Sequence, residues 1–527
     1  MTALARTYGI ALDGLVGLPV EVQTHIGPGI VGTTLVGLPD ASLREAKERV
    51  RAALSSCGVG AANQRVTVNL TPADLPKTGS GFDLAIATSM LVARDLLPVD
   101  GWAETVLLAE LGLDGSLIPV AGALPAAAAA ADAGFRRIVV AYRNATEARL
   151  ISGIEVVPAR HLGDFLGAFS ADADPWSVIE SLGQQALELE GLDAGETREE
   201  RRAQEQEPDL ADVRGQDEAV LALKVAAVGG HHMLLHGPPG SGKTMLARRL
   251  PGILPDLSQR DALVTTALRS LEGSQSGPAE LVTRPPFESP HHSATLASLV
   301  GGGSPVRPGA VSLAHGGVLL LDEAPEFSPR TLDALRQPLE MASVSVHRAK
   351  SHVNFPARFQ LVMTANPCPC GGAGAVGDAC RCAPHRVATY RARLSGPLLD
   401  RVDLQQHVDR PARLDLLSAP KESSAQVAEQ IREARERSRR RWQETPWTTN
   451  AEVPGRFIRQ SEELSPSYTR DLERLVERGI ISLRGVDRIL RLAWSCADLA
   501  GHPEPDSADE ALAMELRGIR GGAPTWI

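Results

Sequence analysis

Hydrophobic residues along the first 170 positions fall into two alternating patterns. Short apolar runs predict strands, and longer runs with helical spacing predict helices. The expected strands cover residues 66–70, 105–111 and 137–140, and the expected helices cover 41–55, 82–97 and 121–133. Strands that alternate with helices are typical of an α/β or α+β domain. We therefore expect one such domain at 1–170.

The pattern is lost after residue 170 and returns near residue 208. Residues 184–207 are acidic and polar with few large apolar side chains, which favours a solvated, partly helical linker over 171–207. Strands and helices with many glycines between them follow at 208–410. Residues 411–527 have mostly helical spacing. The chain is therefore expected to hold two mixed domains and a C-terminal helical domain.

Composition narrows the class of protein. The 527 residues exceed what one hydrophobic core usually spans, and 43% hydrophobic with 22% charged residues is ordinary for a globular protein. The net charge of −10 means that any nucleic-acid site must be local. Six cysteines do not predict a disulfide scaffold. Residues 121–135 are too short and alanine-rich to span a bilayer, and no signal peptide is recognised, so we expect a cytoplasmic protein without a membrane partner.

A glycine-rich motif stands between an apolar strand and a helix-like run. Its residues are Gly237, Pro238, Pro239, Gly240, Ser241, Gly242, Lys243 and Thr244, which fit G-x-x-x-x-G-K-T. Glycines let backbone N–H groups face an anion, and the helix N-terminus adds a positive dipole end. Lys243 is placed to reach nucleotide phosphates and Thr244 to offer its hydroxyl to Mg²⁺. The alternative is a chance glycine-rich turn, and the flanking elements argue against it.

Polar residues end two further apolar strands. Asp322 and Glu323 follow four apolar residues, which places them at the carboxyl end of a buried strand, where ligands of α/β folds sit. Asp322 suits Mg²⁺ and Glu323 suits the activation of water. Asn366 ends the next strand and is placed to orient water near the γ-phosphate. Two acids at a strand end are common, and the nearby phosphate loop favours the catalytic interpretation.

Two arginines are candidates for stabilising the charge of a transferred phosphate. Arg401, in RLSGPLLDRVDL, suits an arginine finger supplied to a neighbouring subunit. Arg484 begins an amphipathic run, ISLRGVDRILRLAWSCADLAG, and suits a helical lid over the nucleotide. Spacing alone favours an ordinary surface arginine at position 484.

Four of the six cysteines lie within fifteen residues. Cys368, Cys370, Cys380 and Cys382 form two C-x-C pairs around a glycine-rich stretch. Four thiolates suit a closed, structural Zn²⁺ site that would brace the region next to Arg401. C-x-C is tighter than the usual spacing, and His385 is a spare ligand. Reduced thiols in a loop and a redox switch are the alternatives.

Several segments together resemble the ComM/YifB family of Mg-chelatase-like AAA+ ATPases. They are GLPDASLREAKERVRAAL, HGPPGSGKT, ESPHHSATLASLVGGG, GGVLLLDEAPEF, TANPCPCG, RLSGPLLDRVDL and RGVDRILRLAWSCADLAG. The resemblance implies an AAA+ P-loop core with a helical lid, ATP and Mg²⁺ as cofactors, and a homo-hexamer. It also implies DNA branch migration in recombination or natural transformation. In that family pattern Gly237–Thr244, Asp322–Glu323, Asn366, Arg401 and Arg484 are Walker A, Walker B, sensor 1, the finger and sensor 2.

The same resemblance implies a Lon-protease-like α+β fold for residues 1–170. An active Lon site needs a serine and a lysine, and here Gly81 stands at the serine position, one place after Ser80. Leu124 or Pro125 stands where the lysine belongs, so we expect a proteolytically inactive domain used for assembly or DNA contact. Lys77 is interpreted as a surface lysine.

The segment SVSVHRAKSHVNFP, 343–356, predicts a β-hairpin with His347, Arg348 and Lys350 at its tip. In the resembling AAA+ branch such hairpins point into the central pore, where Arg348 and Lys350 would contact DNA phosphates. The alternative is an exposed hairpin whose charges only aid solubility. The arginine-rich run at 430–442 carries interleaved glutamates, which favours a salt-bridged exposed helix over a second DNA face.

Three functions follow as hypotheses. The first is an ATP-driven DNA motor. The second is a chelatase-type protein remodeller, or a regulatory ATPase that does not translocate DNA. The third, an ATP-dependent protease, is disfavoured by the missing lysine.

Overall fold

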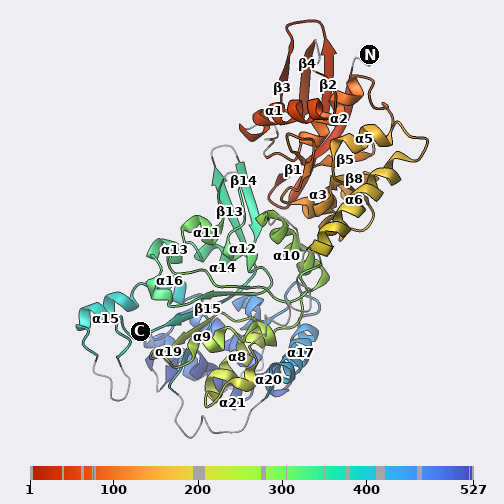
Figure 1. The fold of residues 1–527 in the computed structure, drawn as a ribbon. Helices are drawn as coiled ribbons and strands as arrows, with labels where there is room; N and C mark the ends of the chain where they lie inside the picture. Colours follow the sequence, from red (N-terminus) through yellow and green to blue (C-terminus); the bar gives the residue numbers. More distant parts are fainter. Residues whose placement is uncertain are drawn as a thin grey trace.

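The computed structural model describes most of the chain. The described residues are 4–37, 41–60, 64–73, 75, 77, 79–193, 208–273, 280–303, 306–348, 351–373, 380–410, 422–459, 466–520 and 523–524. Figure 1 shows a first domain, coloured red to yellow, that contacts a second domain, coloured green to blue.

The first domain is built on a mixed seven-stranded sheet. Its order is β3 (Gly32–Val36), β4 (Arg65–Thr71), β2 (Val16–Gly27), β1 (Ala5–Asp13), β5 (Thr105–Leu108), β8 (Arg137–Ala141) and β9 (Glu155–Ala159). β1 pairs with β2 and β2 with β4 in antiparallel register, and the other neighbours are parallel. β6 (Glu110–Leu111) and β7 (Leu117–Ile118) form a small separate ladder.

Helices cover both faces of this sheet. They are α1 (Ala41–Ser56), α2 (Asp83–Ala93), α3 (Ala123–Asp132), α4 (Ala145–Ala148), α5 (Leu162–Ala168) and α6 (Pro175–Asp193). Alternate residues of β8 belong to two cores: Ile138 and Val140 to the core that contains α3, and Val139 to the core that contains α2. The predicted strands and helices of this domain are confirmed, and its α+β class with them.

α6 occupies much of the segment expected to be a linker. It packs against β9 and carries the fully buried Ile179. Glu190 pairs with Arg143, and Glu180 pairs with Arg149. The first domain therefore extends well beyond residue 170, and residues 194–207 of the expected linker lie outside the described residues.

The second domain contains a five-stranded parallel sheet. Its order is β11 (Phe287–Glu288), β12 (Val318–Leu321), β15 (Gln360–Ala365), β10 (Met233–His236) and β16 (Leu404–His407). β10, β12 and β15 are buried throughout, as expected for parallel strands covered on both faces. One face packs on α8 (Asp217–Gly229) and the helices that follow residue 422, and the opposite face packs on α11 to α14.

The remaining elements of this domain surround the sheet. They are α9 (Lys243–Ala247), α10 (Gln259–Glu272), α11 (Leu296–Val300), α12 (Ala310–Leu313), α13 (Pro329–Asp333), α14 (Arg336–Met341), α15 (Pro384–Arg391) and α16 (Gly396–Leu399). β13 (Ser343–Arg348) and β14 (Ser351–Pro356) form the predicted hairpin, with Arg348 opposite Ser351. The hairpin stands away from the sheet and towards the first domain in Figure 1.

The C-terminal part is helical, as its periodicity predicts. Its elements are α17 (Ser424–Arg441), α18 (Gly455–Ile458), α19 (Pro466–Glu477), α20 (Leu483–Ala500) and α21 (Ser507–Leu516), followed by the short strands β17 (Ile519–Arg520) and β18 (Ala523–Pro524). On the exposed side of α17, arginines pair with glutamates of the same helix, as in Arg432–Glu429 and Arg440–Glu436. On the other side, Arg435 donates to the carbonyl of Ala227 and Arg441 pairs with the buried Asp498. The exposed, salt-bridged interpretation is therefore confirmed for one side of this helix only.

The two domains contact each other through α3 and the hairpin. The N–H of Gly122 donates to the carbonyl of Ser270 on α10 at 2.9 Å. Leu15, in the β1–β2 turn, packs with Val353 and Phe355 of β14 and with Leu268 of α10. The base of the hairpin is therefore covered by the first domain.

Among the helices in the described ranges, none has both the length and the apolar character that a bilayer crossing requires.

Candidate active site

The phosphate loop connects β10 to α9 at the carboxyl edge of the parallel sheet. Gly237 has φ +157°, and a Cβ at this position would lie 2.1 Å from the carbonyl oxygen of Val408. Gly242 has φ +89°, in the left-handed region that favours glycine. The loop is held in place from outside, because Gln216 donates to the carbonyl of Ser241 at 3.2 Å and Arg410 to that of Pro239 at 3.1 Å.

Lys243 folds back over the loop. Its Nζ donates to the carbonyl oxygens of Gly237 and Pro238 at 2.8 and 2.9 Å, and to Oδ1 of Asn366 at 3.2 Å. Burial lowers the pKa of Lys243, while the charges of Asp322 and Glu323 act in the opposite direction. The ammonium group of Lys243 is therefore hydrogen-bonded to neutral oxygens and lies near two acids. A bound anionic phosphate could replace those neutral oxygens as its partner.

Asp322 is bonded to two threonine hydroxyls. Its Oδ1 accepts from Thr244 at 2.8 Å and from Thr364 at 2.6 Å. The backbone N–H of Glu323 donates to Oγ1 of Thr364 at 2.8 Å. Glu323 itself is exposed and has φ +52°, which a non-glycine residue rarely adopts. The end of β12 is therefore fixed by β15 at a strained turn.

These residues enclose one cavity of about 300 Å³. Its lining residues are Pro239, Gly240, Gly242, Lys243, Thr244, Met245, Asp322, Glu323, Thr364 and Asn366. Parallel strands end at the same edge of the sheet. The phosphate loop after β10, the acidic pair after β12 and Asn366 after β15 therefore meet there, as predicted. The donor set of a hydroxyl and a carboxylate oxygen fits Mg²⁺, which prefers oxygen ligands.

Arg401 lies outside the cavity of its own chain. It follows α16 and pairs with Glu340 on α14, and its Nη1 donates to the carbonyl of Pro397 at 2.5 Å. Its carbonyl oxygen accepts from Arg488 of α20 at 3.3 Å. The side chain is 14% exposed and is held against its own domain.

Arg484 stands in the first turn of α20 and is exposed. Among the described residues it has no hydrogen bond or ion pair, and it does not line the cavity. One turn later, Arg488 pairs with the buried Asp403, two residues after Arg401. α20 is therefore anchored to the segment that carries Arg401.

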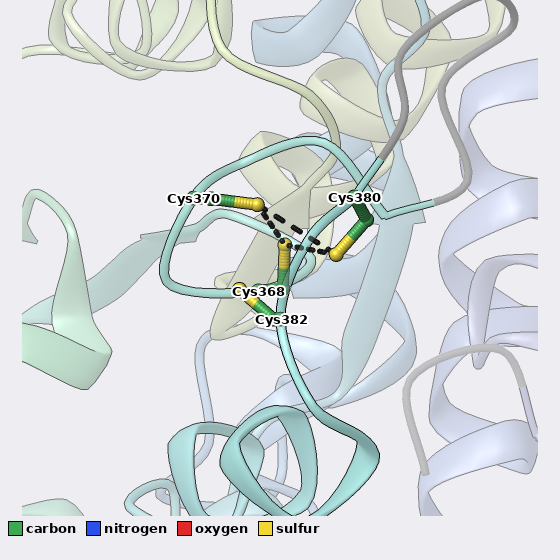
Figure 2. Close-up of side chains that lie close together, drawn as sticks. All are labelled: Cys368, Cys370, Cys380 and Cys382. Atoms are coloured by element: carbon green, nitrogen blue, oxygen red, sulfur yellow. Dashed lines mark hydrogen bonds between the residues drawn. The ribbon is translucent and has the colours of Figure 1, made fainter.

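The four clustered cysteines converge, as Figure 2 shows. Sγ of Cys368 lies 3.3 Å from that of Cys370 and 3.6 Å from that of Cys380, and all four sulfurs lie within 4.8 Å of one another. Tetrahedral Zn–S bonds of about 2.3 Å require sulfurs about 3.8 Å apart, so the geometry fits four thiolates around zinc. Hydrogen bonds from the Gly372 N–H and the neighbouring thiols lower the pKa of Cys370 to about 6. His385 is exposed on α15 and is outside this cluster.

The cysteine loop also contacts the phosphate loop. A Cβ on Gly371 would lie 2.3 Å from Cγ of Pro239, so the backbone of the cysteine loop packs against the Pro239 side chain of the phosphate loop. Ala373 donates its N–H to Sγ of Cys368 at 3.3 Å, a typical support for a metal-binding sulfur. The cysteine loop therefore contacts Pro239, which lines the cavity, while the four cysteines themselves do not line it.

The tip of the predicted hairpin is described only in part. His347 is exposed, and Arg348 pairs through its backbone with Ser351. Lys350 lies outside the described residues.

The first domain departs from one expectation. Lys77 is fully buried and donates to the carbonyl oxygen of Pro72, so its interpretation as a surface lysine was wrong. Ser80 donates to Glu110 instead of to a lysine. Arg49 pairs with the buried Asp83 at 2.6 Å in the same cluster. Arg49, Asp83 and Glu110 therefore form a charged cluster beside Ser80.

Sequence reasoning missed Thr364, Gln216 and Arg410 as supports of the site. Thr364 precedes Asn366 by two residues, and in a strand this spacing places both on one face. That spacing was the available signal for Thr364. Gln216 and Arg410 lie far from the motif in sequence, so nothing local indicated them.

Three family models match successive parts of the chain. "Magnesium chelatase, subunit ChlI" matches residues 209–416, and its C-terminal model matches residues 421–517. A further model, "Subunit ChlI of Mg-chelatase", matches residues 21–144 in the first domain.

Relatives match over nearly the whole length. The chain is 45% identical to Mycobacterium tuberculosis protein Rv2897c over 98% of this chain and 99% of the relative. It is 40% identical to Escherichia coli YifB over 94% of both, and 38% identical to Haemophilus influenzae competence protein ComM over 98% of both. The first domain has a shorter match, 30% identical over 144 residues, to Lon protease 2 of Bacillus subtilis, covering 26% of each chain.

Proposed function

The chain belongs to the ComM/YifB family, which joins a Lon-like first domain to a Mg-chelatase-like AAA+ core, and from this premise we propose that it is an ATP hydrolase that remodels DNA. The meeting of Lys243, Thr244, Asp322, Glu323 and Asn366 around one cavity is the observation that carries the proposal.

Each of these side chains has a role that suits hydrolysis of a phosphate anhydride. Lys243 exchanges its carbonyl partners for the β- and γ-phosphates, and Asn366, already bonded to Lys243, orients the attacking water. Glu323 is exposed at the cavity and accepts a proton from that water. Thr244 and Asp322 would hold Mg²⁺, which supplies charge neutralisation on the phosphate oxygens when bound.

The site needs a second chain to supply a cationic finger. Arg401 is paired with Glu340 of its own chain and lies outside the cavity of that chain, so it suits the site of a neighbour. A head-to-tail contact of this kind closes into a ring, and the hexamer implied by the family resemblance is the assembly that we propose. Arg484, exposed on α20, is proposed to reach the nucleotide as the lid closes.

DNA is the proposed substrate of the motor. The supporting features are the β13–β14 hairpin, the position of Arg348 and Lys350 around its turn in the sequence, and a relative named as a competence protein. A ring of such tips would create a local positive potential in a chain of net charge −10. Branch migration is the activity that this arrangement would serve.

The cysteine loop is proposed to hold structural zinc. All four positions are filled by Cys368, Cys370, Cys380 and Cys382, so the metal would brace the wall next to Pro239 and would not take part in hydrolysis.

The central experiment measures ATP hydrolysis by the purified full-length protein with and without a four-way DNA junction. We expect junction DNA to raise the rate, and Glu323→Gln to bind ATP while its turnover falls by about 100-fold or more. Arg348→Ala with Lys350→Ala should weaken junction binding and reduce its salt dependence. Arg439→Ala with Arg440→Ala removes the same charge from exposed α17 and is the matched control.

Distinct outcomes separate the proposals. Absence of ATP turnover by the wild type would contradict the enzymatic proposal. ATP turnover that junction DNA leaves unchanged, together with no DNA binding at low salt, would leave an ATPase and favour the chelatase-type remodeller.

A further inference from the structure

Thr364 joins the two acidic residues of the site by a single hydroxyl. The side chain is 1% exposed, on the buried strand β15. Oγ1 lies 2.8 Å from the backbone nitrogen of Glu323 and 2.6 Å from Oδ1 of Asp322. A backbone N–H can only donate, so Oγ1 accepts from Glu323 and sends its own proton to Asp322. The direction of both hydrogen bonds is therefore fixed.

The bond to Glu323 secures an unfavourable backbone conformation. Glu323 has φ +52°, and a non-glycine residue in this region costs about 1 kcal/mol or more. The turn is closed on its other side by the N–H of Glu326, which donates to the carbonyl of Glu323 at 2.7 Å. Thr364 thus accepts the hydrogen bond of the Glu323 N–H, and Glu326 donates to the Glu323 carbonyl. With both backbone groups of Glu323 fixed, its side chain is directed towards the cavity.

The bond to Asp322 becomes more important when the site is loaded. Asp322 Oδ1 accepts from Thr244 as well as from Thr364. Thr244 is the residue expected to turn its hydroxyl towards Mg²⁺. Thr364 is then the one side chain in the described part of the chain that still donates to this oxygen.

We propose that Thr364 is a positioning residue that sets both the metal-facing carboxylate of Asp322 and the water-facing carboxylate of Glu323. This inference rests on the proposed ATPase function. Thr364 contacts both acids from β15, and Asn366 directly follows this strand, so one strand helps to align all three groups. Thr364 is among the residues that line the cavity, and no proton transfer is assigned to it.

Three variants test the proposal in the full-length protein. Thr364→Val keeps the shape and removes both hydrogen bonds, while Thr364→Ser keeps the hydroxyl. Thr265→Val is the matched control, because Thr265 is also fully buried and donates to the carbonyl of His315 at 3.0 Å, away from the cavity. For each variant, kcat and KM for ATP, affinity for a fluorescent nucleotide and half-saturating Mg²⁺ are measured, with thermal unfolding as a check of folding.

We expect Thr364→Val to lower kcat by about tenfold or more, with KM and nucleotide affinity within about threefold of wild type. The half-saturating Mg²⁺ concentration should rise several-fold, because Asp322 loses the donor that orients it. Thr364→Ser should retain at least about half of kcat, and Thr265→Val should change only thermal stability.

Three results would overturn the inference. They are a kcat of Thr364→Val within twofold of wild type, a loss in Thr364→Ser as large as in Thr364→Val, and an unchanged Mg²⁺ dependence in a folded Thr364→Val protein with low kcat. A wild-type protein without ATP turnover would instead overturn the proposed function, so the two failures are distinguishable.

Discussion

Two histidines of the AAA+ core accept backbone hydrogen bonds at Nδ1. His315 accepts from the N–H of Arg358 at 3.2 Å, and His232 accepts from that of Leu361 at 3.0 Å. An imidazole that accepts at Nδ1 is unprotonated at that atom. Burial lowers the pKa of both side chains to about 4, and the charge of Arg358 acts in the same direction on His315. The folded protein therefore excludes a proton that the unfolded chain binds.

Stability is expected to fall on acidification, starting below neutral pH. An unfolded histidine has a pKa of about 6.5, so between pH 6.5 and 4 the unfolded state binds protons that the folded state does not. His315 should cost about 2 kcal/mol of unfolding free energy at pH 5 relative to pH 7.5. Urea unfolding at the two pH values measures the loss, and His315→Asn, which keeps an acceptor oxygen without titrating in this range, should reduce it.

His502→Asn is the control for this prediction. His502 is bonded to Asp509, and this bond raises the pKa of His502, so its removal cannot relieve acid destabilisation. If acidification lowers the unfolding free energy equally in wild type and His315→Asn, His315 is protonated in the folded state without penalty, and the prediction is wrong.

At the scale of elements, local patterns in the sequence were enough to predict the strands of the parallel sheet. β10, β12 and β15 carry unbroken apolar runs because both of their faces are covered, and these runs were recognisable. A polar residue directly after such an apolar run marks the end of the strand. Asp322 and Asn366 could therefore be placed at one edge of the sheet from the sequence alone. The hairpin and α20 followed from periods of 2 and 3.6.

Features that depend on distant chain segments could not be predicted. Threonine is common in strands, so nothing marks Thr364 as the partner of Asp322 until β12 and β15 are adjacent. Lys77 resembles a surface residue because its burial requires the carbonyl of Pro72 to be presented to it. Most residues of α6 are only partly buried, and the side that packs on the rest of the first domain can be identified only once β9 lies against it.

The cysteine loop gives a prediction at the scale of one element. The purified protein should hold about one zinc per chain, and Cys370→Ser with Cys380→Ser should lose it, because a thiolate site depends on all four ligands. Elemental analysis measures the metal. Since Gly371 packs on Pro239, KM for ATP should rise in the same variant.

Cys57→Ser is the matched control, since Cys57 lies in the first domain, away from the cluster. It should keep both zinc content and KM. A metal-free wild type with full ATPase activity would contradict the zinc site.

At the scale of the whole molecule, we propose that the site is divided between the phosphate loop of one chain and Arg401 of another. Arg401 is paired with Glu340 in its own chain and is absent from the cavity that Lys243 lines. On this proposal a complete site requires two copies arranged head to tail. The α20 contacts to Arg401 and Asp403 connect the helical lid of one chain with the residue that it would offer to its neighbour.

Mixing two inactive variants tests this division. Lys243→Ala and Arg401→Ala should each reduce ATP turnover by about 100-fold or more. Random mixing at equal concentration should restore activity at up to about one quarter of the interfaces, where an intact loop meets an intact finger. Turnover measured against mixing ratio gives the result.

Glu340→Ala supplies the control, because it removes the partner of Arg401 within the chain and leaves both halves of the site intact. It should keep activity. Full turnover by a particle with the mass of one chain, or an active Arg401→Ala protein, would contradict the divided site.

The contact between Leu15 and the strand that carries Val353 and Phe355 has a practical consequence. A truncated protein that begins near residue 208 would leave these apolar side chains open to water, so it should aggregate unless Val353 is replaced by a polar residue. In the intact chain, the same contact couples the hairpin mechanically to the first domain. Force applied to the hairpin by a bound polymer would therefore be shared with that domain instead of bending the hairpin alone.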